Sequence, residues 1–416
     1  MRLNLGSLAL GVATSATQIE GGSVDTNWHR WADQVGKVKD GSTPARAVDH
    51  WNRLDEDIAL LGELGIAHYR MGLEWARIEP KDGVFDEHAI AHYRSELMKL
   101  RAAGITPLVT LHHFNNPGWL EERGAWERHS TIAIFLRYVK RIVQELSDLV
   151  TDWITINEPS VYATFSYAFG DWPPGRTSIP TAMKVMSHLA QAHCRAYNLI
   201  HALQDEAQVG LAHHLRVFDP ANRLNPLDIA GAKAMAFLFQ DAMLEACSYG
   251  HFRYPLKPSA AIKPGIYFDF TGVNYYSRSW VSGFSQGTRP GCEVNDLGWE
   301  YYPEGMGRVL EMVAQRCPGP IFITENGTAD AADVIRPRFL YDHLAAIIDS
   351  GARVDRYYHW SFIDNWEWIE GEDPRFGLVH VDYDTQVRTI RDSGRFYADL
   401  IANAGCTDEA YARWVA

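Results

Sequence analysis

Short apolar runs alternate along this chain with longer stretches in which apolar residues recur every three or four positions. Such runs are typical of buried strands, and such stretches are typical of amphipathic helices. In one stretch Trp51, Leu54, Ile58 and Leu61 lie at helical spacing, and Gly65 follows. The runs predict eight strands, at residues 9–18, 66–75, 106–113, 153–158, 209–215, 268–276, 320–326 and 355–362.

A predicted helix follows each strand. These helices cover about residues 51–64, 87–103, 135–149, 182–203, 227–249, 304–316, 338–349 and 391–403. Strict alternation of strand and helix implies a parallel sheet, and eight units in 416 residues fit an α/β fold of the closed (β/α)₈ barrel type. Because no linker or break in composition interrupts the pattern, we expect residues 1–416 to form a single domain. The alternative, an open doubly wound sheet, would need a glycine-rich phosphate loop after a strand, and the sequence has none.

Two of the predicted strands stop on a glutamate. One ends at Glu158, where Pro159 removes a backbone donor, and the other carries Glu325 near its end. In barrels of this kind the site is built at the carboxyl ends of the strands. Those ends carry further amides, aromatic rings and charged groups, which suit a hydroxyl-rich ring better than a core: Gln18, Arg70, His113, Asn157, Asn274, Tyr276, Trp360, Glu367 and Trp368.

Two carboxyl groups facing each other across a sugar ring cleave a glycosidic bond, and a separation of about 5 to 5.5 Å means retention of configuration. One group must be protonated and the other ionised, so their surroundings must push the two pKa values apart. Arg70 and Tyr276 are predicted to support Glu325 as the anionic nucleophile. Glu158 has no evident cation near it in the sequence, and it is the predicted acid.

Charge and cysteine spacing narrow the choice of partners and compartment. The formal charge of −13 argues against nucleic acid and anionic membrane, and it fits a small neutral substrate. No apolar stretch approaches the ~20 residues of a membrane helix. The five cysteines lie far apart without a C-x-x-C pair, which predicts reduced thiols and a cytoplasmic protein. The sequence leaves open whether the chain is a monomer or a homo-oligomer.

Several motifs resemble those of glycoside hydrolase family 1, the family of β-glucosidases and β-galactosidases. Thr155-Ile-Asn-Glu-Pro and Ile323-Thr-Glu-Asn-Gly are similar to its two signature motifs. The likeness spans nearly the whole chain and includes Ala13-Thr-Ser-Ala-Thr-Gln-Ile-Glu-Gly, Gly272-Val-Asn-Tyr-Tyr, Gly298-Trp-Glu-Tyr-Tyr-Pro-Glu-Gly and Trp360-Ser-Phe-Ile-Asp-Asn-Trp-Glu-Trp. Six such motifs in the family's order form a specific pattern.

The resemblance implies that Glu158 is the acid and base and that Glu325 is the nucleophile. It also implies that hydroxyls of the non-reducing sugar are bound by Gln18, His113, Asn157, Glu367 and Trp368. Trp360 would lie beneath the sugar ring and Trp299 beside the leaving group, and Phe376 is a candidate cleft wall. Because a carboxylate at Glu367 would repel a phosphate, we expect an unphosphorylated sugar.

The sequence therefore predicts a retaining β-glycosidase, and in particular a β-glucosidase that acts on small glucosides such as cellobiose. No cofactor and no metal are expected. Adjacent strand residues point to opposite faces, so neither His112 and His113 nor His213 and His214 can chelate one ion as a pair. Two alternatives remain: a preference for β-galactosides or β-fucosides, and a sugar-binding barrel that has lost catalysis.

Overall fold

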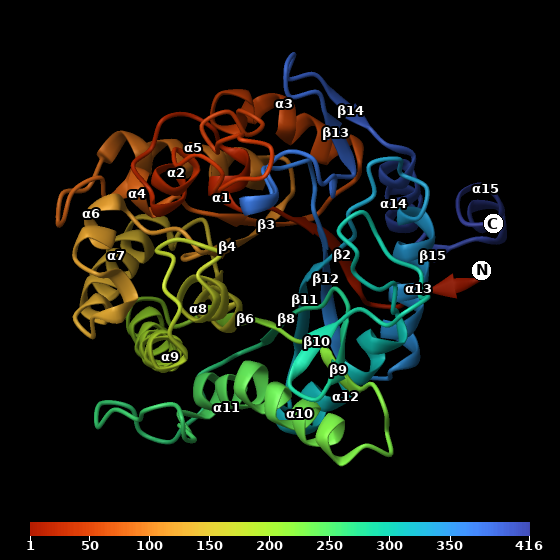
Figure 1. The fold of residues 1–416 in the computed structure, drawn as a ribbon. Helices are drawn as coiled ribbons and strands as arrows, with labels where there is room; N and C mark the ends of the chain where they lie inside the picture. Colours follow the sequence, from red (N-terminus) through yellow and green to blue (C-terminus); the bar gives the residue numbers. More distant parts are fainter.

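A closed barrel of eight parallel strands forms the centre of the computed structural model, which describes residues 1–416. The strands are joined in the order β11-β12-β2-β3-β4-β5-β6-β8, and helices surround them (Figure 1). Their bounds are β2 Ala9–Ala13, β3 His68–Gly72, β4 Thr106–Thr110, β5 Asp152–Asn157, β6 Gln208–His214, β8 Thr271–Asn274, β11 Ile321–Asn326 and β12 Val354–Trp360. The predicted (β/α)₈ barrel is thus confirmed.

Every predicted helix is present in the outer ring. The main helices are α3 His50–Glu63, α5 Glu87–Ala102, α7 Thr131–Leu146, α9 Ile179–Leu203, α10 Pro226–Ala236, α11 Ala242–Tyr249, α12 Glu304–Arg316, α13 Arg336–Asp349 and α14 Asp392–Ala402. The single helix predicted over residues 227–249 consists of α10 and α11 joined by a π-helical segment, η3 Phe237–Asp241.

Shorter elements lie in the connections. The short helices are α1 Ala16–Ile19, α2 Asn27–Ala32, α4 Trp75–Ile78, α6 Gly118–Glu122, η1 Ala125–Glu127, α8 Pro159–Ala163, η2 Thr164–Phe169, η4 Trp368–Glu370 and α15 Asp408–Trp414. Three small sheets join β7 Val217–Pro220 with β9 Arg278–Ser282 and β10 Ser285–Gly287, β13 Val379–Val381 with β14 Arg388–Ile390, and β1 Leu3–Asn4 with β15 Gly405–Cys406. The amino and carboxyl ends of the chain therefore pair with each other.

The prediction of one strand over residues 9–18 is wrong in its second half, where α1 begins. Ser15 donates a hydrogen bond to Gln18 Oε1 at 2.7 Å, and Thr17 donates to Glu74 Oε2 at 2.6 Å. Serine and threonine side chains that find such local or neighbouring partners favour turns and helix starts over strand pairing. The turn places Gln18 on a helix at the mouth of the barrel.

Apolar side chains pack in two layers that hold the barrel rigid. A large cluster fills the space between strands and helices, and a second cluster of 11 buried residues includes Leu108, Ile154, Phe270 and Phe322 of the barrel itself. Side chains that fill a barrel interior make it a packed core. No helix is long and apolar enough to cross a bilayer.

Candidate active site

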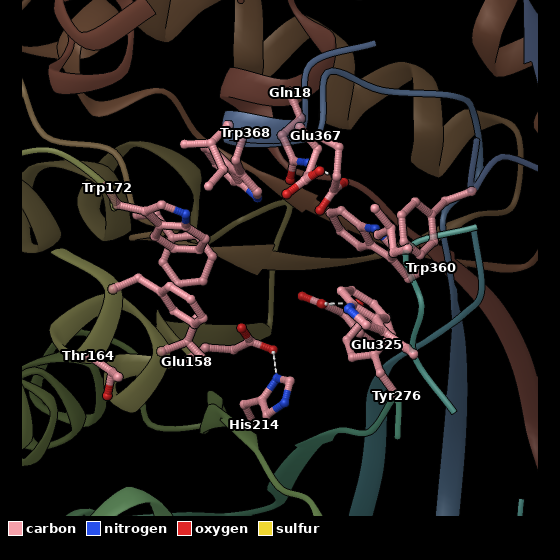
Figure 2. Close-up of a pocket in the computed structure, with 18 of the residues that line it drawn as sticks. Gln18, Glu158, Thr164, Trp172, His214, Tyr276, Glu325, Trp360, Glu367 and Trp368 are labelled. Carbon is pink, nitrogen blue, oxygen red and sulfur yellow. Dashed lines mark hydrogen bonds and ion pairs between the residues drawn. The ribbon is translucent and has the colours of Figure 1, made fainter. Parts of the chain in front are cut away.

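A cavity of about 460 Å³ opens among the loops that follow the carboxyl ends of the strands. Figure 2 shows Glu158 and Glu325 on facing walls of this cavity, with Gln18, Glu367 and Trp368 grouped at one end. Eight of the predicted site residues line it together with Glu158 and Glu325: Gln18, His113, Tyr276, Trp299, Trp360, Glu367, Trp368 and Phe376.

Both oxygens of Glu325 accept hydrogen bonds from the protein. Arg70 Nη1 donates to Glu325 Oε1 at 2.6 Å, and the Tyr276 hydroxyl donates to Glu325 Oε2 at 2.6 Å. Arg70 is fully buried, and it is held on strand β3 by the Thr110 hydroxyl and the Thr324 carbonyl. The structure thus brings both predicted supporting residues onto Glu325, where a cation and a hydroxyl stabilise a carboxylate.

Glu158 is held differently, by one oxygen only. Asn274 Nδ2 donates to Glu158 Oε1 at 2.8 Å, and His214 Nδ1 lies 2.9 Å from the same oxygen. No cation near Glu158 is evident in the sequence, but the ionisable ring of His214, from the end of β6, contacts it in the structure. Oε2 makes no hydrogen bond with the protein, so it is the oxygen that can reach a ligand.

The backbone at Glu158 contributes to this orientation. Glu158 follows β5 and precedes α8 with φ at 41°, a left-handed conformation that a glutamate rarely adopts. Phe114 and Trp368, which also line the cavity, share this conformation at φ values of 66° and 53°. Strained backbone of this kind concentrates at functional sites, where the surrounding structure enforces it.

A chain of hydrogen bonds links the two carboxyl groups beneath the cavity floor. Arg70, which holds Glu325, also donates to Asn157 Oδ1 at 2.7 Å. Asn274, which holds Glu158, contacts the same Asn157 oxygen at 3.1 Å. Asn157 and Asn274 have no exposed surface, and neither lines the cavity. Their predicted contact with substrate stays a prediction, while their observed contacts fix the two glutamates relative to each other.

Burial and charge act on the pKa values of the two glutamates. Burial raises the pKa of Glu325 to about 7, against the charge of Arg70 and the hydrogen bond from Tyr276. Burial also raises the pKa of Glu158, but the charge and hydrogen bond of His214 and the hydrogen bond of Asn274 outweigh it and lower the net value. The proton affinity of Glu158 therefore depends on the charge of His214.

The opposite end of the cavity combines amide, carboxyl and indole groups. Gln18 Nε2 donates to Glu367 Oε2 at 3.0 Å, and burial followed by the charge of Glu325 raises the pKa of Glu367 to about 8. The His113 ring is nearly parallel to those of Trp360 and Trp368, with centroids 5.9 and 6.1 Å away. Polar groups between flat apolar walls suit a ring that carries hydroxyls on its edge.

His214 is the contact that the sequence interpretation missed. In the sequence it figures only as half of a histidine pair, and that pair is rejected as a metal site. A usable signal was its place at the carboxyl end of the strand next to β5, since neighbouring parallel strands end at the same edge of a sheet. Arg216, two residues further on, lines the cavity as well and was also missed.

Barrel, cavity and paired carboxyl groups define the class of a glycoside hydrolase. The chain belongs to glycosyl hydrolase family 1, whose model matches residues 6–406. It is 33% identical to β-glucosidase A of Acetivibrio thermocellus over 95% of this chain and 97% of that protein. These findings confirm the predicted family and enzyme class, and they support a β-glucosidase.

Solved structures support the same family assignment. The β-glucosidase of Thermotoga maritima in complex with glucoimidazole matches with a TM-score of 0.91 at 30% identity, covering 98% of this chain and 100% of that one. The same enzyme in complex with galacto-hydroximolactam matches with a TM-score of 0.90 at 31% identity, covering 96% and 99%. The full barrel and its loops are therefore shared with family 1 β-glucosidases.

Proposed function

We propose that this enzyme hydrolyses small unphosphorylated β-glucosides, cellobiose among them, by double displacement with retention of configuration. Glu325 attacks the anomeric carbon while Glu158 protonates the departing oxygen, and Glu158 then deprotonates the water that releases the sugar. The chain acts as a single catalytic domain. The observation that carries this assignment is the unequal bonding of the two carboxyl groups.

Glu325 suits the nucleophile because both of its oxygens accept from donors that favour the anion, Arg70 and Tyr276. Glu158 suits the acid and base because Oε2 is free of protein partners while Oε1 is anchored. The charge of Arg70 is permanent, whereas a histidine can lose its charge near neutral pH. A neutral His214 removes the largest of the effects that lower the pKa of Glu158, so that the burial which raises it favours the protonated acid.

The positions of the lining residues in the cavity support the sugar-binding roles that we propose for them. Gln18, Glu367 and Trp368 are assigned to the hydroxyls of the non-reducing sugar, with His113 beside them and Trp360 against the ring. Trp299 and Phe376 form the wall near the leaving group, and their ring centroids lie 6.0 Å apart. Glu367, whether protonated or ionised, offers a phosphate no positive charge, whereas it can bond to sugar hydroxyls, which supports an unphosphorylated substrate.

A preference for galactosides is the second candidate. The Thermotoga maritima relative binds a galacto-configured hydroximolactam as well as glucoimidazole, which supports a cleft of this type that tolerates both configurations. A carboxyl group such as Glu367 can bond to either epimer of a 4-hydroxyl. Values of kcat/KM for nitrophenyl β-glucoside, β-galactoside and β-fucoside decide between these substrates.

Trapping the covalent intermediate tests the mechanism. A 2-fluoro-β-glucoside with a good leaving group should form a stable adduct, and peptide mass spectrometry should place the sugar on Glu325. An adduct on Glu158, or turnover without any adduct and with inverted product, would refute the assignment.

The cysteines bear on the proposed compartment. All five, Cys194, Cys247, Cys292, Cys317 and Cys406, are free thiols, and all but Cys292 are buried. Unpaired cysteines are typical of proteins kept in a reducing compartment. This supports the proposal of a cytoplasmic enzyme.

A further inference from the structure

The guanidinium of Arg216 lines the cavity without a protein partner. The Arg216 backbone N–H donates to Gln240 Oε1 at 3.0 Å, which fixes the main chain beside η3. The side chain makes no hydrogen bond and no ion pair, and its Nε is buried unsatisfied. Burial lowers the pKa of Arg216, as expected for a guanidinium that is partly removed from water. Leaving a charged donor partly desolvated is unfavourable unless an acceptor binds it.

The other charged groups of the cavity wall already have partners. Lys39, the other cation with a long side chain, contacts Glu370 Oε2 at 2.6 Å. Asp296 Oδ2 accepts from the Ala331 N–H at 2.7 Å. The three glutamates deeper in the site are held by Arg70 and Tyr276, by His214 and Asn274, and by Gln18. Arg216 is thus the cation of the cavity wall whose side-chain N–H groups are free to bind a ligand.

Arg216 lies on the side of the cavity where the leaving group departs. It lies two residues after His214, the last residue of β6, which contacts Glu158, and Glu158 is the group that protonates the departing oxygen. Aromatic side chains from two π-helical segments line the same cavity: Phe165 and Phe169 of η2, and Phe239 of η3, whose ring centroid lies 5.8 Å from that of His214. Such segments occur often at functional sites. Flat apolar walls beside a free guanidinium fit an aromatic group that carries an anion.

We propose that Arg216 binds a carboxylate on an aromatic leaving group, so that phenolic β-glucosides bearing an acid are preferred substrates. The inference rests on the proposed function, because it places the leaving group beside Glu158. A guanidinium pairs a carboxylate through two parallel hydrogen bonds, and such charge-assisted bonds are roughly twice as strong as neutral ones. Repulsion from the wall is small, since Glu158 is protonated before bond cleavage and Glu370 is paired with Lys39.

A matched pair of substrates tests this proposal. The value of kcat/KM is measured for 4-carboxyphenyl β-glucoside and for its methyl ester, with the wild type and with Arg216→Gln. Differences in leaving-group ability cancel when the acid-to-ester ratio of the wild type is divided by that of the variant. This quotient should be about tenfold or more, as expected for loss of a hydrogen bond to a charged group. A quotient near one overturns the proposal.

Two controls separate this role from a structural one. Arg94→Gln removes the same charge from the outer helix α5, where Arg94 pairs with Asp148, and should leave the acid-to-ester ratio unchanged, while Arg216→Lys should retain part of the preference. An equal loss on the acid, the ester and cellobiose would make Arg216 a structural residue or a hydroxyl ligand and would overturn the proposal.

Binding of the released aglycone gives a readout that does not depend on a stable variant. The wild type should be inhibited more strongly by 4-hydroxybenzoate than by its methyl ester, and equal or reversed inhibition overturns the proposal. Failure of the wild type to hydrolyse any β-glucoside would instead refute the proposed function. Hydrolysis of nitrophenyl glucoside without an acid preference would refute the role of Arg216 alone.

Discussion

His214 Nδ1 lies 2.9 Å from Glu158 Oε1, so an ionisable ring holds the carboxyl group that we assign as acid and base. The same oxygen accepts from Asn274, and the His214 ring is nearly parallel to that of Tyr276, with centroids 5.9 Å apart. The histidine is thus packed between the two halves of the catalytic apparatus. Burial raises the pKa of Glu158, and the charge of a protonated His214 is the largest of the effects that lower it.

Replacing His214 should move the alkaline limb of the pH profile. In His214→Phe the charge that lowers the pKa of Glu158 is absent, and burial alone raises it. Glu158 then keeps its proton to higher pH, so the alkaline limb of kcat/KM should shift upward. His214→Asn keeps a neutral donor and should shift the limb in the same direction. A limb that stays in place or moves downward would show that the charge of His214 does not act on Glu158.

Removing the nucleophile should nearly abolish turnover. In Glu325→Ala, kcat should fall by on the order of 10⁴-fold or more, because covalent catalysis is lost while binding groups remain. Azide is small enough to enter the vacated space, and it should restore part of the rate with a glycosyl azide of inverted configuration as product. Product analysis by NMR provides the check, and near-normal activity without azide would exclude Glu325 as nucleophile.

Removing the Tyr276 hydroxyl should shift the acidic limb of the pH profile of kcat/KM. In the proposed mechanism Glu325 acts as an anion, and burial raises its pKa, so kcat/KM should decline as acid protonates it. The Tyr276 hydrogen bond lowers this pKa, and Tyr276→Phe should therefore shift the acidic limb to higher pH and reduce kcat by roughly 10- to 100-fold. The control is Tyr275→Phe, because the Tyr275 hydroxyl donates to the Tyr302 carbonyl instead. Identical pH profiles for both variants would contradict the assignment.

Asp364 should matter for stability. It is fully buried after β12, and burial is outweighed by hydrogen bonds and charges from His380, Arg391 and Arg375, which lower its pKa well below the usual value. Its contribution is present above the unfolded pKa of about 4 and is lost as the pH falls toward the folded value. Asp364→Ala should cost about 3 to 5 kcal/mol, because it leaves buried cations unpaired.

Urea unfolding measures this change. Asp384→Asn removes a solvent-exposed ion pair with Arg46 and should cost at most about 1 kcal/mol, so it serves as the control. Equal effects of the two substitutions would show that burial adds nothing to the Asp364 pairs.

Hydrophobic periodicity in the sequence was sufficient to predict the barrel, but it was less reliable for the ends of individual strands. Runs such as residues 106–113 were predicted to extend to His113, whereas β4 stops at Thr110, because pairing with neighbouring strands ends there. The polar strands β9 and β10 carry no apolar alternation strong enough to predict them. The π-helical segment η3 lies within a continuous helical pattern, and a one-residue widening leaves no mark on that pattern.

The site was predictable where a motif or a strand end marked it. Arg70 and Tyr276 were placed correctly on Glu325 from their positions alone. The ionisable ring beside Glu158 was missed, because that contact depends on the direction in which His214 points after β6. Arg216 was missed for a similar reason: its lack of a partner is a property of the packed structure and not of the sequence.

The strand order has a consequence for how this enzyme can change. Glu158 and Glu325 belong to the ends of β5 and β11, with β6 and β8 between them in the barrel wall. The width of the gap between these two carboxyl groups is thus set by the circumference of the sheet, while residues of η2, η3 and the loops line the rest of the cavity. Mutation can therefore alter which molecules are cleaved without altering the stereochemistry of the cleavage.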